Sequence, residues 1–136
     1  MAGTWLTNIN TRMDSENANS GTSEGTYNAG TKISEAATVI GTATAFTFPA
    51  FVAANLQSFF LVCDQGTVAN PVVIIITLAT GSKTLNMVAG QPYYWDVNNA
   101  NLCANPFAYN AVSATYNVPT ALAVTLANIT GRVEVS

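Results

Sequence analysis

Two carboxylates of the chain, Asp64 and Asp96, are residues whose type could support acid–base chemistry. A pair of carboxylates flanking a glycosidic bond is the usual machinery of a glycoside hydrolase. Neither residue belongs to a recognisable motif, however, and an Asp in a β domain is more commonly a turn residue. A glycosidase that uses Asp64 and Asp96 stays as an alternative, but we expect that the protein is not an enzyme.

The residue types that most other catalytic and metal sites need are missing. The chain has no histidine, so Cys63 and Cys103 lack an imidazole partner for nucleophilic catalysis, and most zinc and iron sites are excluded. A disulfide between these cysteines is possible, but two free thiols are favoured for a chain made in a reducing cytoplasm. A calcium loop beginning at Asp96 fails because its fifth and twelfth positions are Ala100 and Phe107. We therefore expect no catalytic residue, no metal site and no cofactor.

The densest aromatic cluster is the run Tyr93-Tyr94-Trp95-Asp96. Alternation along a strand would place Tyr93 and Trp95 on one face, and Tyr94 and Asp96 on the other. Aromatic rings beside a carboxylate could bind a sugar by stacking and hydrogen bonding. We favour the other interpretation, in which Tyr93 and Trp95 fill the core and Tyr94 lies at the surface or in a subunit contact. A core rich in Ala and Val needs large residues somewhere.

Charged side chains are scarce beyond residue 35. The chain is 8% charged and 49% hydrophobic, whereas an ordinary domain is about a quarter charged. From residue 36 to residue 136, the charged residues are Asp64, Lys83, Asp96, Arg132 and Glu134. Little repulsion keeps so neutral a surface away from its neighbours, so we expect other chains to cover much of it. The Lys and Arg residues are dispersed, which argues against nucleic acid as a partner.

The elements that must position these residues begin after a polar first segment. Residues 1–37 are rich in Asn, Ser, Thr and Gly, with few apolar anchors, and most of them show no regular period. Such a segment alone cannot bury enough surface to offset its ordering entropy. A free tail is one interpretation. We favour an extended, irregular arm that becomes ordered across a neighbour, with Trp5, Leu6 and Tyr27 as interaction residues.

Residues 38–136 form the predicted domain. Short runs of β-branched, aromatic and alternating residues are separated by Gly, Pro and Asn turns, and no helix of ten residues is evident. The expected strands cover residues 42–48, 59–63, 72–79, 84–88, 93–97, 111–117, 121–129 and 132–135. The consecutive aliphatic residues of 72–79 indicate burial on both faces. This pattern predicts an all-β, two-sheet antiparallel β-sandwich, jelly-roll-like in type.

Neither a secretory signal nor a membrane span is predicted. The N-terminus lacks a basic region followed by an apolar one. The longest aliphatic run, residues 72–79, is too short for a transmembrane helix, which needs about 20 residues. We expect a soluble protein with no membrane partner.

The combination of a polar arm and a nearly uncharged, Ala/Thr/Val-rich β domain resembles the small virion proteins of tailed bacteriophages. The similarity is to head decoration (cement) proteins and to small β-sandwich modules of head or tail fibres. The stretches that carry it are residues 59–63, 85–95 and 122–133. The resemblance extends over residues 40–136 in general character, and it implies no active-site residues.

The resemblance implies a structural role on the virion. A cement protein made in the bacterial host cytoplasm would bind the major capsid protein on the capsid surface, as a homotrimer, and would stabilise the capsid through many weak contacts. The strand at residues 72–78 would then place one face in the core and the other against a neighbour. The alternative is a fibre or tail-associated module that binds a carbohydrate or receptor through Tyr94, Trp95 and Asp96.

Overall fold

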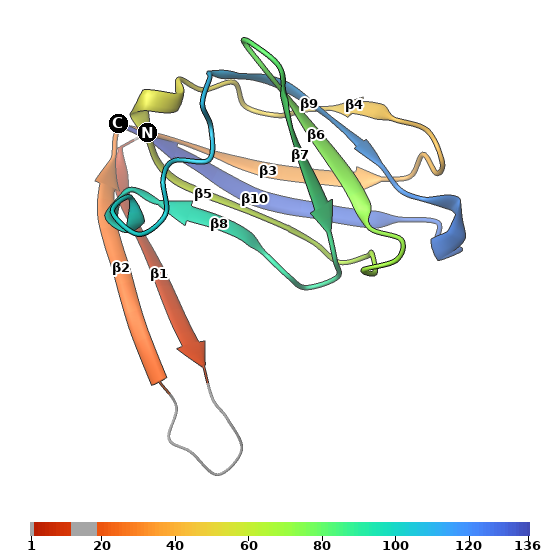
Figure 1. Cartoon of the computed structure of the whole chain (residues 1–136), viewed down its shortest axis with the longest axis horizontal. Helices are drawn as coiled ribbons and strands as arrows, with labels where there is room; N and C mark the ends of the chain where they lie inside the picture. Colours follow the sequence, from red (N-terminus) through yellow and green to blue (C-terminus); the bar gives the residue numbers. More distant parts are fainter. Residues whose placement is uncertain (1, 12–18) are drawn as a thin grey trace.

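A computed structural model describes residues 2–11 and 19–136. These residues fold into strands, connecting loops and short 3-10 helices, and the strands of the body pack as two antiparallel sheets (Figure 1). The prediction of an all-β, two-sheet sandwich is therefore confirmed. Within the described ranges, no helix is long and apolar enough to cross a membrane.

The chain forms three sheets. The hairpin consists of β1 (Gly3–Thr11) and β2 (Asn19–Tyr27). The first body sheet has the order β3 (Ala29–Ala37), β10 (Ala127–Val135), β5 (Leu56–Cys63) and β8 (Tyr93–Asp96). The second has the order β4 (Thr44–Phe46), β9 (Ala111–Asn117), β6 (Val72–Leu78) and β7 (Ser82–Met87). The 3-10 helices are η1 (Ala53–Asn55), η2 (Val97–Asn99) and η3 (Thr120–Leu122).

The strand order is that of a jelly roll. If β3 is counted as the first body strand, the first sheet has the order 1-8-3-6 and the second 2-7-4-5. Successive strands thus cross between the sheets, except in the β6–β7 hairpin, and each sheet pairs the start of the body with its end. This interleaving of two Greek keys defines the jelly roll, so the sequence-based prediction of that type agrees with the topology.

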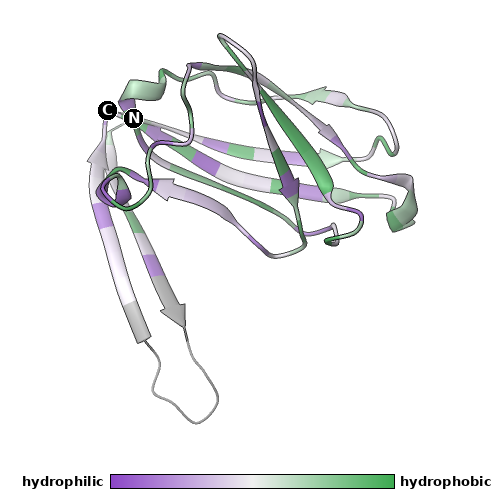
Figure 2. Cartoon of the chain, viewed as in Figure 1, coloured by the Kyte–Doolittle hydropathy of each residue, from purple (hydrophilic) through white to green (hydrophobic). Residues whose placement is uncertain are grey.

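The core lies between the sheets and follows the alternation of the strands. In β6, Val72, Ile74 and Ile76 are fully buried, whereas the residues between them are half-buried. Aromatic rings fill one end of the core, where the ring of Phe107 lies 5.0 Å from the rings of Phe51 and Phe59. β6 is therefore apolar on both faces but covered by its own chain on only one, and Figure 2 shows it as a continuous hydrophobic strand.

The last strand of the body differs from the sequence-based expectation at two points. The expected break at Thr130-Gly131 does not occur, and β10 continues from Ala127 to Val135. A Cβ at Gly131 would clash with the backbone carbonyl of Phe60, so the glycine permits close approach to β5 at the centre of the sheet. Residues 121–126 are not the start of this strand, because η3 and a left-handed Ala123 occupy that stretch.

The arm predicted at residues 1–37 is shorter and more regular than expected. Residues 29–37 form β3, an edge strand of the body that is held by the buried Ile33 and Ala37. The described residues before it are not irregular, because β1 and β2 pair in register from Gly3↔Tyr27 to Thr11↔Asn19. This hairpin projects from one end of the sandwich, beside the outer face of the first sheet (Figure 1).

Glycines explain how so polar a hairpin becomes ordered. A Cβ at Gly25 would lie 2.7 Å from the indole of Trp5, and one at Gly3 would lie 2.6 Å from the Tyr27 hydroxyl. A Cβ at Gly30 of β3 would lie 2.9 Å from the edge of the same Tyr27 ring. Each ring thus lies against bare backbone, a contact that compensates for the missing glycine side chain.

Candidate functional site

One row of polar residues crosses the outer face of the first sheet. Glu134 of β10 pairs with Ser58 of β5, and Ser58 pairs with Asp96 of β8. In the described part of the chain, these three are the buried polar or charged residues, with exposed fractions of 2%, 7% and 2%. They lie on the outer side of the sandwich, so a structure outside the sheet must cover them.

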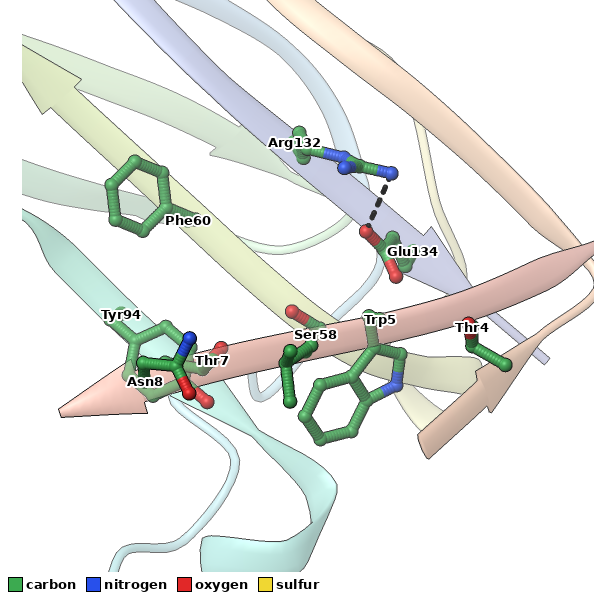
Figure 3. A pocket seen from close by; sticks show the side chains of 10 residues that line it. Thr4, Trp5, Thr7, Asn8, Ser58, Phe60, Tyr94, Arg132 and Glu134 are labelled. Carbon is green, nitrogen blue, oxygen red and sulfur yellow. Dashed lines mark ion pairs between the residues drawn. The ribbon is translucent and has the colours of Figure 1, made fainter. Parts of the chain in front are cut away.

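The hairpin provides much of that cover. Trp5 is 4% exposed, although β1 belongs to no body sheet, and its indole lies beside Ser58 (Figure 3). Asn98 of η2 fixes the other strand of the hairpin. Its side-chain amide donates to Ser23 Oγ at 3.1 Å and to the carbonyl of Glu24 at 2.9 Å. The base of the hairpin is therefore docked on its own sheet.

A groove remains between β1 and the outer face of the first sheet, with a volume of about 470 Å³. One wall is the β1 segment from Thr4 to Asn8, which carries Trp5. Along the sheet, Phe60 pairs with Arg132 on one side and with Tyr94 on the other. Figure 3 shows this arrangement. The full lining is Thr4, Trp5, Leu6, Thr7, Asn8, Ser58, Phe60, Tyr94, Arg132 and Glu134.

The charges of the groove form one ion pair. Arg132 Nη2 lies 3.0 Å from Glu134 Oε1, with the arginine side chain half exposed and the glutamate side chain 3% exposed. Burial raises the pKa of Glu134 above its ordinary value of 4.5, and the nearby Arg132 lowers it by a smaller amount. The carboxylate therefore lies in a dry environment in which its unpaired oxygen is costly.

Three buried polar side-chain atoms in the described residues have no hydrogen-bond partner. They are Trp5 Nε1, Tyr94 Oη and Glu134 Oε2. All three residues line the same groove. Native proteins leave few buried polar groups unpaired. A Cβ at Gly25 would lie 2.9 Å from Trp5 Nε1, so that atom faces β2 rather than the open groove.

A second surface is unusual because it has no charge at all. Along β6 the outward residues are Val73, Ile75 and Thr77, of which the first two are half-buried and the third is exposed. Their neighbours on β7 and β9 are hydroxyl and amide residues: Asn86, Thr84, Ser82, Asn117, Thr115 and Ser113. We call this surface, the outer face of β4-β9-β6-β7, the neutral face.

Every charged side chain of residues 36–136 contacts its own chain. Asp64 accepts hydrogen bonds from the backbone and side chain of Asn128, at 2.7 and 2.8 Å. Lys83 lies over the ring of Tyr93, at 5.6 Å from its centroid. Asp96 caps η2 by accepting from the backbone N–H groups of residues 98 and 99, and Arg132 pairs with Glu134. These charges stabilise the fold, and few remain to repel a neighbouring chain.

The residues singled out in the sequence fall in different places. Trp5 and Tyr94 line the groove, and Leu6 lies at its rim with 60% exposure. Tyr27 packs on glycines at the base of the hairpin. Trp5 and Tyr27, expected to anchor the arm on a neighbour, therefore contact the protein's own backbone.

The structure separates Trp95 from Tyr94 and Asp96. As the favoured interpretation predicted, Trp95 is buried in the core, and its indole N–H donates to the carbonyl of Cys103 at 2.8 Å. A sugar site that combines Tyr94, Trp95 and Asp96 on one surface is therefore wrong, because alternation along β8 points Trp95 inward.

The two candidate catalytic carboxylates do not meet. Asp64 follows the end of β5, and Asp96 pairs with Ser58 near the other end of that strand. Six residues of extended strand place the two positions about 20 Å apart, too far for either glycosidase geometry.

Cys63 is buried and Cys103 is exposed, and both are free thiols. Burial raises the pKa of the Cys63 thiol.

Comparison with protein-family models, with curated proteins and with solved structures gave no match. Ser58, Phe60 and Glu134 were not predicted as site residues from the sequence. Alternation within residues 56–63 and 132–135 could have placed all three on an outer face, but their coverage by the hairpin has no signal in the sequence.

Proposed function

We propose that this protein is a structural virion protein, a decoration or cement protein that binds and stabilises a bacteriophage capsid as an oligomer. The observation that carries the proposal is the neutral face. An exposed sheet face of Thr, Ser, Asn, Val and Ile without a charged side chain can be buried against another protein at little desolvation cost.

The geometry of β6 supports this use of the neutral face. Val73 and Ile75 stand at its centre, and both are only half-buried by their own chain. A neighbour that covers them would complete the burial of a strand whose inner residues are already in the core. The partner would be the major capsid protein or a second copy of the chain.

The projecting hairpin supports a second contact. Leu6 is 60% exposed, and its partner across the hairpin is Glu24. A two-stranded sheet on its own is marginally stable, so the part of the hairpin beyond its docked base gains from packing on another surface. Two separate contacts per chain would make the bound state long-lived through multivalency.

Binding to capsids that lack the protein tests the proposal. Purified protein is mixed with such capsids, and the bound fraction is measured by sedimentation. We expect saturable binding and survival of the decorated capsids at a higher temperature. The absence of binding to capsids, or decorated capsids that are no more stable than bare ones, would contradict the proposed function.

A further inference from the structure

We propose that two inward-facing charges, Glu35 and Lys83, guard the open sides of the sandwich against edge-to-edge association with other copies of the chain. The inference does not depend on the capsid role. It starts from the edge strands, whose outer backbone groups can pair with a strand of another molecule. Among the described residues, β3 pairs only with β10 and β7 pairs only with β6, so each strand has one unpaired side.

β3 and β7 are the long edges of the two body sheets. They have nine and six residues, whereas the other two edges, β4 and β8, have three and four. A very short edge offers few hydrogen bonds to a partner, so it is a poor template for another strand. The edges that need protection are therefore β3 and β7.

Glu35 faces the inside of the sandwich from β3. It pairs with Ile129 of β10, which is fully buried in the core, and directly paired residues share one face of a sheet. Its neighbours on that face, Ile33 and Ala37, are buried, whereas Glu35 itself is half-buried. Among the described residues, no basic side chain forms an ion pair with Glu35.

Lys83 faces inward from β7 in the same way. It pairs with Ile76 of β6, a fully buried core residue, and Leu85, two residues further along β7, is buried as well. The Lys83 ammonium lies 5.6 Å from the centre of the Tyr93 ring of β8. β7 and β8 thus meet at this side of the sandwich, while β3 is at the far end of the sheet that contains β8. One charge therefore stands at each of the two open sides.

A strand added to either edge would enclose one of these charges. It would extend the sheet beyond β3 or β7 and cover the side through which the half-buried charge reaches water. The charge would then lie unpaired between the sheets, which is strongly unfavourable. An outward charge such as Lys32 stays in water when a strand is added, so it opposes pairing much less. Contacts with other chains are therefore directed to the faces of the sandwich.

The test removes charges inside and outside the sandwich in the full-length chain. Glu35→Gln and Lys83→Gln, alone and combined, keep a polar side chain but remove the inward charge. The matched controls, Glu24→Gln on the hairpin and Lys32→Gln on the outer side of β3, change exposed residues. Each lysine variant changes the net charge from −3 to −4, and each glutamate variant changes it to −2. Sedimentation velocity over a range of concentrations measures assembly size, and amide hydrogen exchange reports on the edge strands.

We expect each inward variant to associate beyond the state of the unsubstituted protein at a concentration at least about tenfold lower than its matched control does. The combined variant should associate most strongly. Because Glu35→Gln and Lys83→Gln change the net charge in opposite directions, association of both cannot result from net charge. Exchange in β3 or β7 should slow on association, because the edge N–H groups gain partners. Lys83→Arg, which keeps the charge, should behave as the unsubstituted protein.

Inward variants that remain in the state of the unsubstituted protein would overturn the proposal, as would equal association of the matched controls. Association that leaves the exchange of β3 and β7 unchanged would show that another surface makes the contact, and it would also overturn the proposal. Urea denaturation of every variant separates association of the folded protein from aggregation of an unfolded one. The two edges are tested independently, so loss of folding in one inward variant leaves the other to decide.

Discussion

The two outer faces of the sandwich have the same type of backbone and very different side chains. The face of β3-β10-β5-β8 carries Lys32, Arg132, Glu134 and Asp96, and a hairpin covers its polar row. The neutral face carries no charged residue and has no cover from its own chain. On the first face, the buried carboxylates Glu134 and Asp96 lie under the cover of the hairpin, where Glu134 pairs with Arg132 and Asp96 caps η2. The uncovered face is free for another molecule.

We expect the largest effect on stability where a core residue is compared with its neighbour on the outer face of β3-β10-β5-β8. Phe59 and Phe60 are neighbours on β5, but Phe59 is fully buried between the sheets and Phe60 lies on the outer face. Phe59→Ala should lower the free energy of unfolding by about 3–5 kcal/mol because it leaves a cavity. Phe60→Ala should lower it by less than about 1 kcal/mol. Urea denaturation measures both, and equal losses would show that the outer face is part of the core.

The next prediction compares capsid binding after a matched substitution on each of the two outer faces. Thr77 on β6 and Thr130 on β10 are both exposed, and each lies on a central strand of its sheet. Thr77→Lys should weaken capsid binding at least about 100-fold, because it buries an unpaired charge in the contact. Thr130→Lys, the matched control, should change binding less than about threefold. If both variants bind equally well, the neutral face is not the contact surface.

A smaller effect concerns Glu134, the buried carboxylate on the outer face of β3-β10-β5-β8. Because the folded-state pKa of Glu134 is raised above 4.5, the folded protein retains a proton that the unfolded chain has released. Stability should therefore fall as the pH rises from about 4.5 through the folded-state pKa. The side chain that Glu134→Gln introduces cannot ionise. The melting temperature of the variant, relative to that of the unsubstituted protein, should therefore rise as the pH rises through this window. A difference that stays constant with pH would contradict the assignment.

The smallest effect concerns the tie between the hairpin and η2. Asn98→Ala removes the hydrogen bonds to Ser23 and to the carbonyl of Glu24. It should cost about 1 kcal/mol, with faster amide exchange in β1 and β2 than in the body. Asn101→Ala, on the exposed loop after η2, is the control and should leave that exchange unchanged. Equal exchange in both variants would show that Trp5 and Tyr27 hold the hairpin alone.

The sequence predicted the sandwich because its strands follow simple alternation. Val72–Leu78 and Leu56–Cys63 each bury a face with period two, and Trp95 points inward as alternation requires. β3 was missed because only Ile33 and Ala37 mark its buried side. The continuity of β10 was missed because Gly131 resembles a turn residue, while its role is close approach to β5.

The groove was not predictable for a different reason. Glu134 stands between Val133 and Val135, a pattern that predicts an outward and solvated carboxylate. Its burial results from the hairpin, which is more than a hundred residues earlier in the chain and meets the sheet where the Tyr27 ring lies against Gly30 of β3. Local patterns carry no information about such a docking event.

The copy number of the protein in purified virions is the decisive test of its proposed role on the capsid. Quantitative mass spectrometry of washed particles gives the ratio of this chain to the major capsid protein. We expect a ratio that corresponds to hundreds of copies per particle, and we expect the Thr77→Lys variant to be lost from the particles. Absence of the protein from washed virions, or a ratio that corresponds to only a few copies, would contradict it.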